Sequence, residues 1–172
     1  DSVKYGFDIT NEKLDNKLTN ISSFAKETIV ELRDTIWAMN SNEISFEDLE
    51  GRIHNFIEKA KEAKDDITFS FEIDKNLATK KLSSVEGMNV YRTIQEAINN
   101  SLKYAKASHI KIEAVKEANQ TKITVSDDGI GFNEAEINYG NGLNNMKKRI
   151  NEIDGKLTIS SSEKGTSIEV LI

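Results

Sequence analysis

Apolar residues at helical spacing run through the first third of the chain. Between residues 13 and 40 they recur every three or four positions, a period between that of a coiled-coil seam and that of an ordinary amphipathic helix. After Asn40-Ser41-Asn42, a capping box of Ser45 and Asp48 begins a second predicted helix. We therefore predict an all-helical segment over residues 1–66. The apolar stripe of its first helix consists of Leu14, Leu18, Ile21, Ala25, Ile29, Leu32, Ile36 and Met39.

The pattern changes to strand spacing after residue 66. Apolar and polar residues alternate over residues 67–73, as in a half-buried strand. Neighbouring short strands favour antiparallel pairs, so residues 67–172 predict an α+β fold, a two-layer sandwich of a mixed, mostly antiparallel sheet with helices on one face. The remaining strands are predicted at 109–115, 121–126, 157–161 and 167–172, and the helices at 84–105 and 143–153.

Composition excludes several classes of protein. The 172 residues include no cysteine, which rules out disulfides, thiolate metal sites and cysteine nucleophiles. A net charge of −6 argues against a nucleic-acid-binding protein, because such proteins usually carry a basic excess. No apolar run approaches the roughly 18 residues of a membrane helix, so we expect no membrane contact by this segment. The sequence begins at Asp1 without a methionine, and we expect it to be part of a longer protein.

Polar side chains with a capacity for phosphate chemistry share one face of the helix predicted at 84–105. A carboxylate, two amides and an ammonium group could hold Mg²⁺ and phosphates there, since Mg²⁺ takes few protein oxygens and leaves the rest to water and phosphate. On spacing alone, a solvated helix face is the simpler interpretation. The four residues, at i, i+3, i+4 and i+7, are Glu96, Asn99, Asn100 and Lys103.

Three glycine-containing segments follow in the second half of the chain. The segment Asp127-Asp128-Gly129-Ile130-Gly131-Phe132 ends a predicted strand, where a carboxylate could accept a hydrogen bond from an amino group such as that of adenine. The segment 140–149 (GNGLNNMKKR) opens a helix, whose N–H groups can bind an anion. Gly165-Thr166 lies between the last two strands. Each segment taken alone could equally be a turn or a loop.

Taken together, these segments resemble the ATP-binding catalytic domain of bacterial sensor histidine kinases, a Bergerat fold shared with gyrase, heat-shock chaperone and mismatch-repair ATPases. Residues 95–103 (QEAINNSLK) resemble the N box, and the three glycine segments resemble the two glycine boxes and the closing Gly-Thr, in the family's order. The form of the N box and a short lid between Phe132 and Gly140 point to the subfamily of nitrate-sensor and lipid-fluidity-sensor kinases. Residues 31–39 (ELRDTIWAM) resemble the end of that subfamily's second dimerisation helix.

The resemblance implies a role for each matching residue. Glu96 and Lys103 would be catalytic, beside the metal ion and the phosphates respectively. Asp127 would bind the adenine amino group, Asn100 would bring an oxygen to Mg²⁺, and Thr166 would support the adenine side. The nucleotide-contacting set, in which the glycines let the backbone approach the nucleotide and hinge the lid, is Asn99, Asn100, Asp127, Gly129, Gly131, Gly140, Gly142, Leu143 and Thr166.

The same resemblance implies the activity, with one departure. We expect a domain that uses ATP and Mg²⁺ to phosphorylate a histidine, from which the phosphoryl group passes to an aspartate of a response-regulator receiver domain. The family's acceptor histidine precedes an acidic residue, whereas His54 precedes Asn55 and His109 precedes Ile110. The acceptor should therefore lie outside this chain, which should not phosphorylate itself.

The expected setting is the cytoplasmic portion of a bacterial sensor protein, which can be membrane-anchored, with a homodimer formed through the N-terminal helices. Residues 1–66 would be a partial dimerisation region and residues 67–172 the catalytic domain. Two alternatives remain open: a dimerisation module that holds nucleotide without transferring phosphate, and a serine kinase of the anti-sigma type on the same fold.

Overall fold

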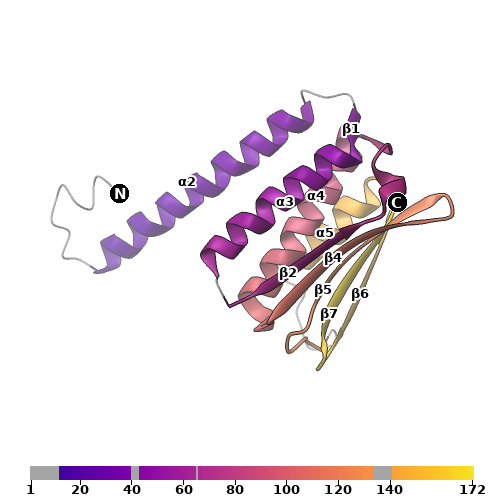
Figure 1. Ribbon diagram of the computed structural model, residues 1–172. Helices are drawn as coiled ribbons and strands as arrows, with labels where there is room; N and C mark the ends of the chain where they lie inside the picture. The colour runs from indigo at the N-terminus through magenta and orange to yellow at the C-terminus, as the bar shows by residue number, and fades with distance from the viewer. Residues whose placement is uncertain (1–11, 40–42, 65, 134–140) are drawn as a thin grey trace. The chain divides into compact units, whose positions relative to one another are not determined.

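The computed structural model describes residues 12–39, 43–64, 66–133 and 141–172 of the chain (Figure 1). The chain divides into two compact units, Asp1–Ser41 and Asn42–Ile172. Within the described ranges, no helix is both long enough and apolar enough to cross a membrane.

The described part of the first unit is one helix, α2 (Glu12–Met39), which confirms the helix predicted over residues 13–40. Several described side chains of its apolar stripe are exposed. Leu14 is 46% exposed, Ile21 64% and Leu32 57%, and Phe24 beside them is 71% exposed. Apolar side chains at helical spacing normally face a partner surface.

The second unit begins with a short strand and a helix that belong together. Strand β1 (Glu43–Ser45) pairs antiparallel with β3 (Lys81–Ser83), and helix α3 (Phe46–Ala63) follows β1 directly. Ser45 caps this helix as predicted, because its Oγ accepts a hydrogen bond from the Asp48 N–H at 3.1 Å. The Asp48 carboxylate accepts the Ser45 hydroxyl proton at 2.6 Å, so the two side chains hold each other at the helix start.

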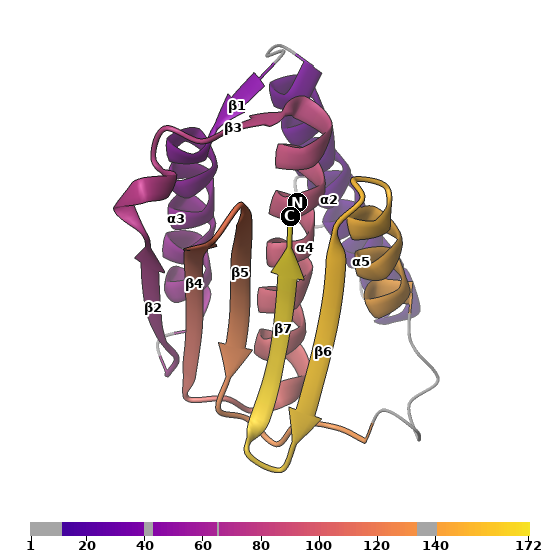
Figure 2. The same cartoon turned by 90° about the vertical axis from the view of Figure 1, so that its right-hand side faces the viewer.

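A mixed five-stranded sheet forms one layer of the second unit within the described residues (Figure 2). Its order is β2-β4-β5-β7-β6, with β2 parallel to β4 and every other neighbouring pair antiparallel. Helices α3, α4 (Ser84–Asn100) and α5 (Asn141–Asn151) cover one face, which confirms the predicted α+β sandwich. The strands are β2 (Thr68–Ile73), β4 (His109–Glu117), β5 (Gln120–Asp127), β6 (Lys156–Ser162) and β7 (Gly165–Leu171).

The core lies between this sheet and the helices. Alternate residues of the strands point inward, as Ile110 and Ile112 do in β4, each at most 1% exposed. Ile98 of α4 and Ile150 of α5, on the helix side of the core, are fully buried. This burial removes the apolar stripes of both helices from water and fixes α4 and α5 against the sheet.

The division of the chain differs from the predicted boundary near Asp66. Helix α3 belongs to the second unit, because Leu49, Ile53 and Ile57 are at most 3% exposed and their helix packs on α4 and β2. An amphipathic pattern shows that a helix has one apolar face but not which surface that face will meet. The sequence could therefore not decide whether α3 packs with α2 or with the sheet.

The α-helical hydrogen-bonding pattern of α4 changes at the carboxyl end of the helix. The α-helix ends at Asn100, and residues Ser101–Ala105 continue as a π-helix that closes at Lys106 in the left-handed region. A π turn holds more residues than an α turn, so it rotates the side chains that follow it. The single helix predicted at 84–105 is thus two segments with different side-chain directions.

Candidate functional site

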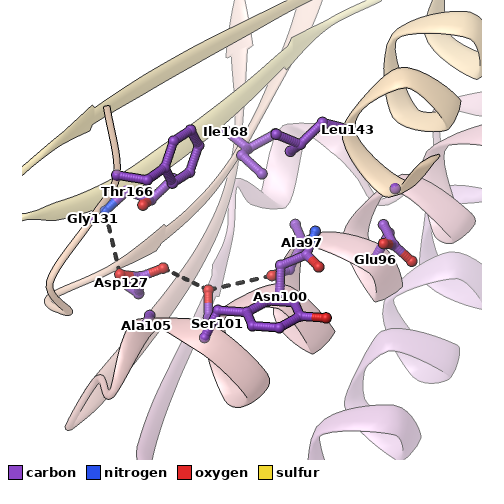
Figure 3. Close-up of a pocket in the computed structure, with 13 residues that line it drawn as sticks. Glu96, Ala97, Asn100, Ser101, Ala105, Asp127, Gly131, Leu143, Thr166 and Ile168 are labelled. Atoms are coloured by element: carbon purple, nitrogen blue, oxygen red, sulfur yellow. Dashed lines mark hydrogen bonds between the residues drawn. The ribbon is translucent and has the colours of Figure 1, made fainter. Parts of the chain in front are cut away.

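A pocket of about 450 Å³ lies where α4, the end of β5, the start of α5 and β7 come together (Figure 3). It is lined by seven residues that the sequence had singled out, from all four segments: Glu96, Asn100, Asp127, Gly131, Gly142, Leu143 and Thr166. Sequence reasoning missed six further lining residues, which are Ala97, Ser101, Tyr104, Ala105, Phe132 and Ile168.

Four predicted site residues are not among those that line the pocket. Gly140 lies outside the described residues. Asn99 and Lys103 lie to the other side of Glu96, because the pocket stripe runs along positions 96, 97, 100, 101, 104 and 105 rather than along the predicted i, i+3, i+4, i+7 face. The π turn after Asn100 adds to the displacement of Lys103, which is exposed.

Gly129, the fourth, packs against the backbone of the π-helix. A Cβ placed on it would lie 2.6 Å from the Ala105 Cβ and closer still to the Ala105 carbonyl oxygen. The next residue, Ile130, donates its N–H to that same carbonyl at 2.8 Å. Gly129 therefore allows the close approach of one backbone segment to another.

Asp127 is the most heavily hydrogen-bonded side chain of the pocket. Its Oδ1 accepts the N–H groups of Gly129 at 3.0 Å and Thr166 at 3.2 Å, and its Oδ2 accepts the hydroxyl proton of Ser101 at 2.6 Å. Figure 3 shows the carboxylate between Ser101 of the π-helix and Thr166 of β7. A carboxylate fixed in this way is a positioned acceptor for a ligand that donates a hydrogen bond.

Thr166, which lines the pocket, is supported from behind by Ser161 of the neighbouring strand β6. Their hydroxyl oxygens lie 3.0 Å apart across the β6–β7 hairpin, and Ser161 Oγ also accepts the N–H of Phe132 at 2.8 Å. Gly131 has a φ of +58°, and a Cβ there would press against the Ser162 carbonyl, so only glycine fits without strain. Ser161 was missed because its position opposite Thr166 depends on the register of the hairpin.

The other end of the pocket brings acidic and amide groups to the start of a helix. A Cβ on Gly142, in the first turn of α5, would lie 3.2 Å from the Glu96 carboxyl carbon and 3.7 Å from the Asn100 side-chain nitrogen. The amino end of a helix favours anions, because its first N–H groups have no partner within the helix. This end of the pocket therefore suits a phosphate group.

The same end has the donor set that Mg²⁺ requires. Asn100 offers an amide oxygen and Glu96 a carboxylate, which are hard oxygen ligands. Among the described residues, no group of three or more His, Cys, Asp or Glu side chains could hold a metal ion by itself. This arrangement fits Mg²⁺, which usually takes one or two protein ligands and completes its shell with phosphate and water.

Asp128 has a different role from its neighbour. Its carboxylate accepts the Ser108 hydroxyl at 2.5 Å and the backbone N–H groups of Ser108 and His109, each at 2.8 Å. These bonds, the Ser108 hydroxyl first among them, hold the pKa of Asp128 below its ordinary value of 3.8. Asp128 thus fixes the start of β4 to the end of β5, outside the pocket.

Comparison with known proteins agrees with this geometry. Residues 86–172 match the sequence profile of the family described as histidine kinase-, DNA gyrase B-, and HSP90-like ATPase. The sensor histidine kinase ComP of Bacillus subtilis (strain 168) is 26% identical over 93% of this chain and 20% of its own length. The sensor histidine kinase YxjM of the same organism is 28% identical over 98% of this chain and 40% of its own length. The chain therefore spans only a fifth to two fifths of these relatives.

Solved structures share the fold at low sequence identity. The Acinetobacter baumannii histidine kinase AdeS matches 99% of this chain and 89% of its own, with a TM-score of 0.67 at 16% identity. The histidine kinase domain of a blue-light activated histidine kinase from Erythrobacter litoralis EL346 matches 75% of this chain and 61% of its own, with a TM-score of 0.64 at 18% identity. At such identity the likeness concerns the fold alone, and it agrees with the α+β sandwich described above.

Proposed function

The chain belongs to the family of histidine kinase-, DNA gyrase B- and HSP90-like ATPases, and it is an ATP-binding catalytic domain of the histidine kinase type; from this membership and the geometry of the pocket we propose how it handles nucleotide. The adenine amino group donates to Asp127, and the phosphates lie at the amino end of α5, beside Gly142 and Leu143. The observation that carries the proposal is the position of the Asp127 carboxylate, fixed by three donors and open to the pocket.

We further propose that Mg²⁺ is held at the phosphate end by Asn100, with Glu96 beside it or its waters. When bound, the ion would neutralise charge on the phosphates. The chain's own part is positioning: Asn100 and Glu96 come from one helix, and α5 presents backbone N–H groups from the facing side. Phosphoryl transfer depends mainly on such positioning and on charge neutralisation.

The proposed reaction is transfer of the γ-phosphoryl group to a histidine that lies outside this sequence. The bond between the γ-phosphorus and the bridging oxygen breaks, a phosphorus–nitrogen bond forms on the imidazole, and ADP leaves. An aspartate of a response-regulator receiver domain would then take the phosphoryl group. Support comes from the relatives, which are named as sensor histidine kinases, and from the N box, which favours the nitrate-sensor and lipid-fluidity-sensor subfamily. ATP is a cytoplasmic substrate, so the proposal places this part of the protein in the cytoplasm.

We assign α2 to a dimerisation segment and Asn42–Ile172 to the catalytic domain. The exposed apolar stripe of α2 supports this assignment, because side chains such as Ile29 and Leu32 would be covered by the same stripe of a second copy. Sedimentation velocity tests it. The chain should self-associate, and Ile29→Asp with Leu32→Asp should lower the association without changing nucleotide binding. A chain that stays monomeric at high concentration would contradict the assignment.

Nucleotide binding is tested by calorimetric titration with ADP and ATP, with and without Mg²⁺. The chain should bind one nucleotide, and Asp127→Asn should weaken binding by about tenfold or more, since loss of a hydrogen bond to a charged group costs about 1.5–3 kcal/mol. Asp128→Asn is the matched control, because it removes the neighbouring carboxylate outside the pocket. Equal losses in the two variants would contradict the assigned adenine site.

Phosphotransfer is tested by adding a helical hairpin that carries a histidine followed by an acidic residue. Radioactive phosphate should appear on that helix and should be lost in acid, as phosphohistidine is. Acid-stable phosphoserine on a partner would instead favour a serine kinase. Nucleotide binding without any transfer would favour a dimerisation module that only holds nucleotide.

A further inference from the structure

Ser101 and the backbone together fill most of the hydrogen-bonding capacity of Asp127. An ionised carboxylate has about four acceptor sites, two on each oxygen. The N–H groups of Gly129 and Thr166 take both sites on Oδ1, and the Ser101 hydroxyl takes one site on Oδ2. Within the described residues, these donors leave one acceptor site on Oδ2. That site is the one a ligand in the pocket can use.

The hydroxyl proton of Ser101 belongs to this bond rather than to the helix backbone. Ser101 Oγ lies 3.3 Å from the Ala97 carbonyl oxygen but 2.6 Å from Asp127 Oδ2, and a hydroxyl has a single proton to donate. The shorter contact is also charge-assisted, which makes it the stronger of the two. Ser101 is only 6% exposed, so water competes little for this bond. The serine therefore fixes the rotation of the carboxylate.

A single free acceptor site on Asp127 suits the hydrogen-bonding edge of adenine better than that of guanine or hypoxanthine. Adenine presents one exocyclic amino group, which one acceptor satisfies. Guanine presents a ring N–H beside an amino group, and this pair matches both oxygens of an unoccupied carboxylate. On Asp127 the second oxygen is already occupied by backbone N–H groups. The 6-carbonyl of guanine or hypoxanthine would instead place an acceptor against an acceptor.

We infer that Ser101 is a specificity-determining residue, which selects adenine over 6-oxopurine nucleotides by filling and orienting Oδ2 of Asp127. The inference rests on the proposed function and deepens it. Without the hydroxyl, Oδ2 has two free sites, and the carboxylate is held only through Oδ1, by the N–H groups of Gly129 and Thr166, so that Oδ2 is less precisely oriented. We then expect the preference for adenine over 6-oxopurine nucleotides to fall. The contribution of the phosphates to binding should change less, because they bind at the other end of the pocket.

The test compares the dissociation constants of ADP, IDP and GDP for the whole chain by calorimetry. The unchanged chain should prefer ADP over IDP and GDP by at least about tenfold, and Ser101→Ala should reduce that preference by about three- to tenfold. Ser101→Cys has a similar volume and a weaker donor, so it should give an intermediate preference. Ser108→Ala is the matched control, because it removes a serine-to-aspartate hydrogen bond of the same kind outside the pocket.

The outcomes separate this inference from the proposal on which it rests. If Ser101→Ala weakens ADP, IDP and GDP equally, or if Ser108→Ala changes the preference as much, Ser101 has only a structural role and the inference is overturned alone. If the unchanged chain binds no ADP, the proposed function fails and the inference with it. A reduced preference in Ser101→Ala, with the phosphate-dependent part of binding retained, supports both.

Discussion

Replacing Gly129 by alanine would put a methyl group into the backbone of the π-helix. The added Cβ would lie 2.6 Å from the Ala105 Cβ and 2.8 Å from the Ala105 carbonyl carbon. Carbon atoms in contact normally lie about 3.5–4.0 Å apart, so the segment must move by about 1 Å or more. That movement pulls Ile130 away from the Ala105 carbonyl, to which its N–H is bonded at 2.8 Å.

The cost follows from these two effects. Overpacking in a well-packed region costs about 1–3 kcal/mol, and the lost backbone hydrogen bond adds about 0.5–1.5 kcal/mol. Alanine also restricts the unfolded chain, which returns about 0.4–1 kcal/mol. We therefore expect Gly129→Ala to lower the free energy of unfolding by about 0.5–4 kcal/mol, which corresponds to a fall in Tm of about 3 °C for each kcal/mol.

Gly51→Ala is the matched control, because a Cβ at this exposed position in the middle of α3 meets nothing within 4 Å. Alanine in a helix interior is favoured over glycine by about 1 kcal/mol, so Gly51→Ala should raise Tm. Thermal unfolding followed by circular dichroism measures both variants, and titration with ADP shows whether displacement of Gly129 reaches Asp127. A Gly129→Ala chain whose Tm equals that of the parent, or rises as that of Gly51→Ala should, would refute the reasoning.

Three further predictions concern stability. Because the Ser108 hydroxyl bond above all lowers the pKa of Asp128, its contribution is complete above the unfolded pKa near 3.8 and is lost as the pH falls through the lower folded pKa. Acid unfolding followed by circular dichroism should therefore lose part of its pH dependence in Asp128→Asn, and an unchanged acid limb would count against this role. The Lys64 ammonium donates to a π-helix carbonyl at 2.7 Å, so Lys64→Met should cost about 0.5–1.5 kcal/mol in urea unfolding. Recovery in Lys64→Arg is the control, and no loss in Lys64→Met would show the bond to be unimportant. A Cβ on Gly87 would lie 2.7 Å from Ile44 Cδ1, so Gly87→Ala should be better tolerated together with Ile44→Val, which removes that atom, by about 0.5–1 kcal/mol in a double-mutant cycle. Strict additivity of the two changes would be the contrary result.

The sequence predicted most strands and helices because their buried positions recur at regular intervals along the chain. Strand β4 alternates because Ile110 and Ile112 face the helices while Lys111 between them faces away. The short strands β1 and β3 were missed, because three residues are too few to display a period. Helix α3 was predicted, but its packing on α4 and β2 was not, because the pattern of a helix does not indicate which surface its apolar face will contact.

The sequence predicted which segments form the candidate site, but not which of their residues contact one another. The N-box helix, the two glycine segments and the Gly-Thr pair were found by their order, and seven of their residues line one pocket. Asn99 and Lys103 share a helix face with Glu96, but the pocket is lined by the neighbouring stripe, which only the tertiary structure shows. The π turn after Asn100 is bonded to the end of β5 and the residues after it, through Ser101 to Asp127 and Ala105 to Ile130, and local sequence does not display these contacts.

The sequence by itself therefore determined the fold class and the family, because periodic burial and the order of glycine and polar motifs are properties of the linear chain. Only the tertiary structure decided what each polar group does. It brought Ser101 to Asp127 across 26 residues and Thr166 to the same carboxylate across 39. It also turned Asp128 away from the pocket and placed Gly129 against Ala105. A hydrogen bond depends on distances of a few tenths of an ångström, and those distances exist only after the strands have paired and α4 has packed on them.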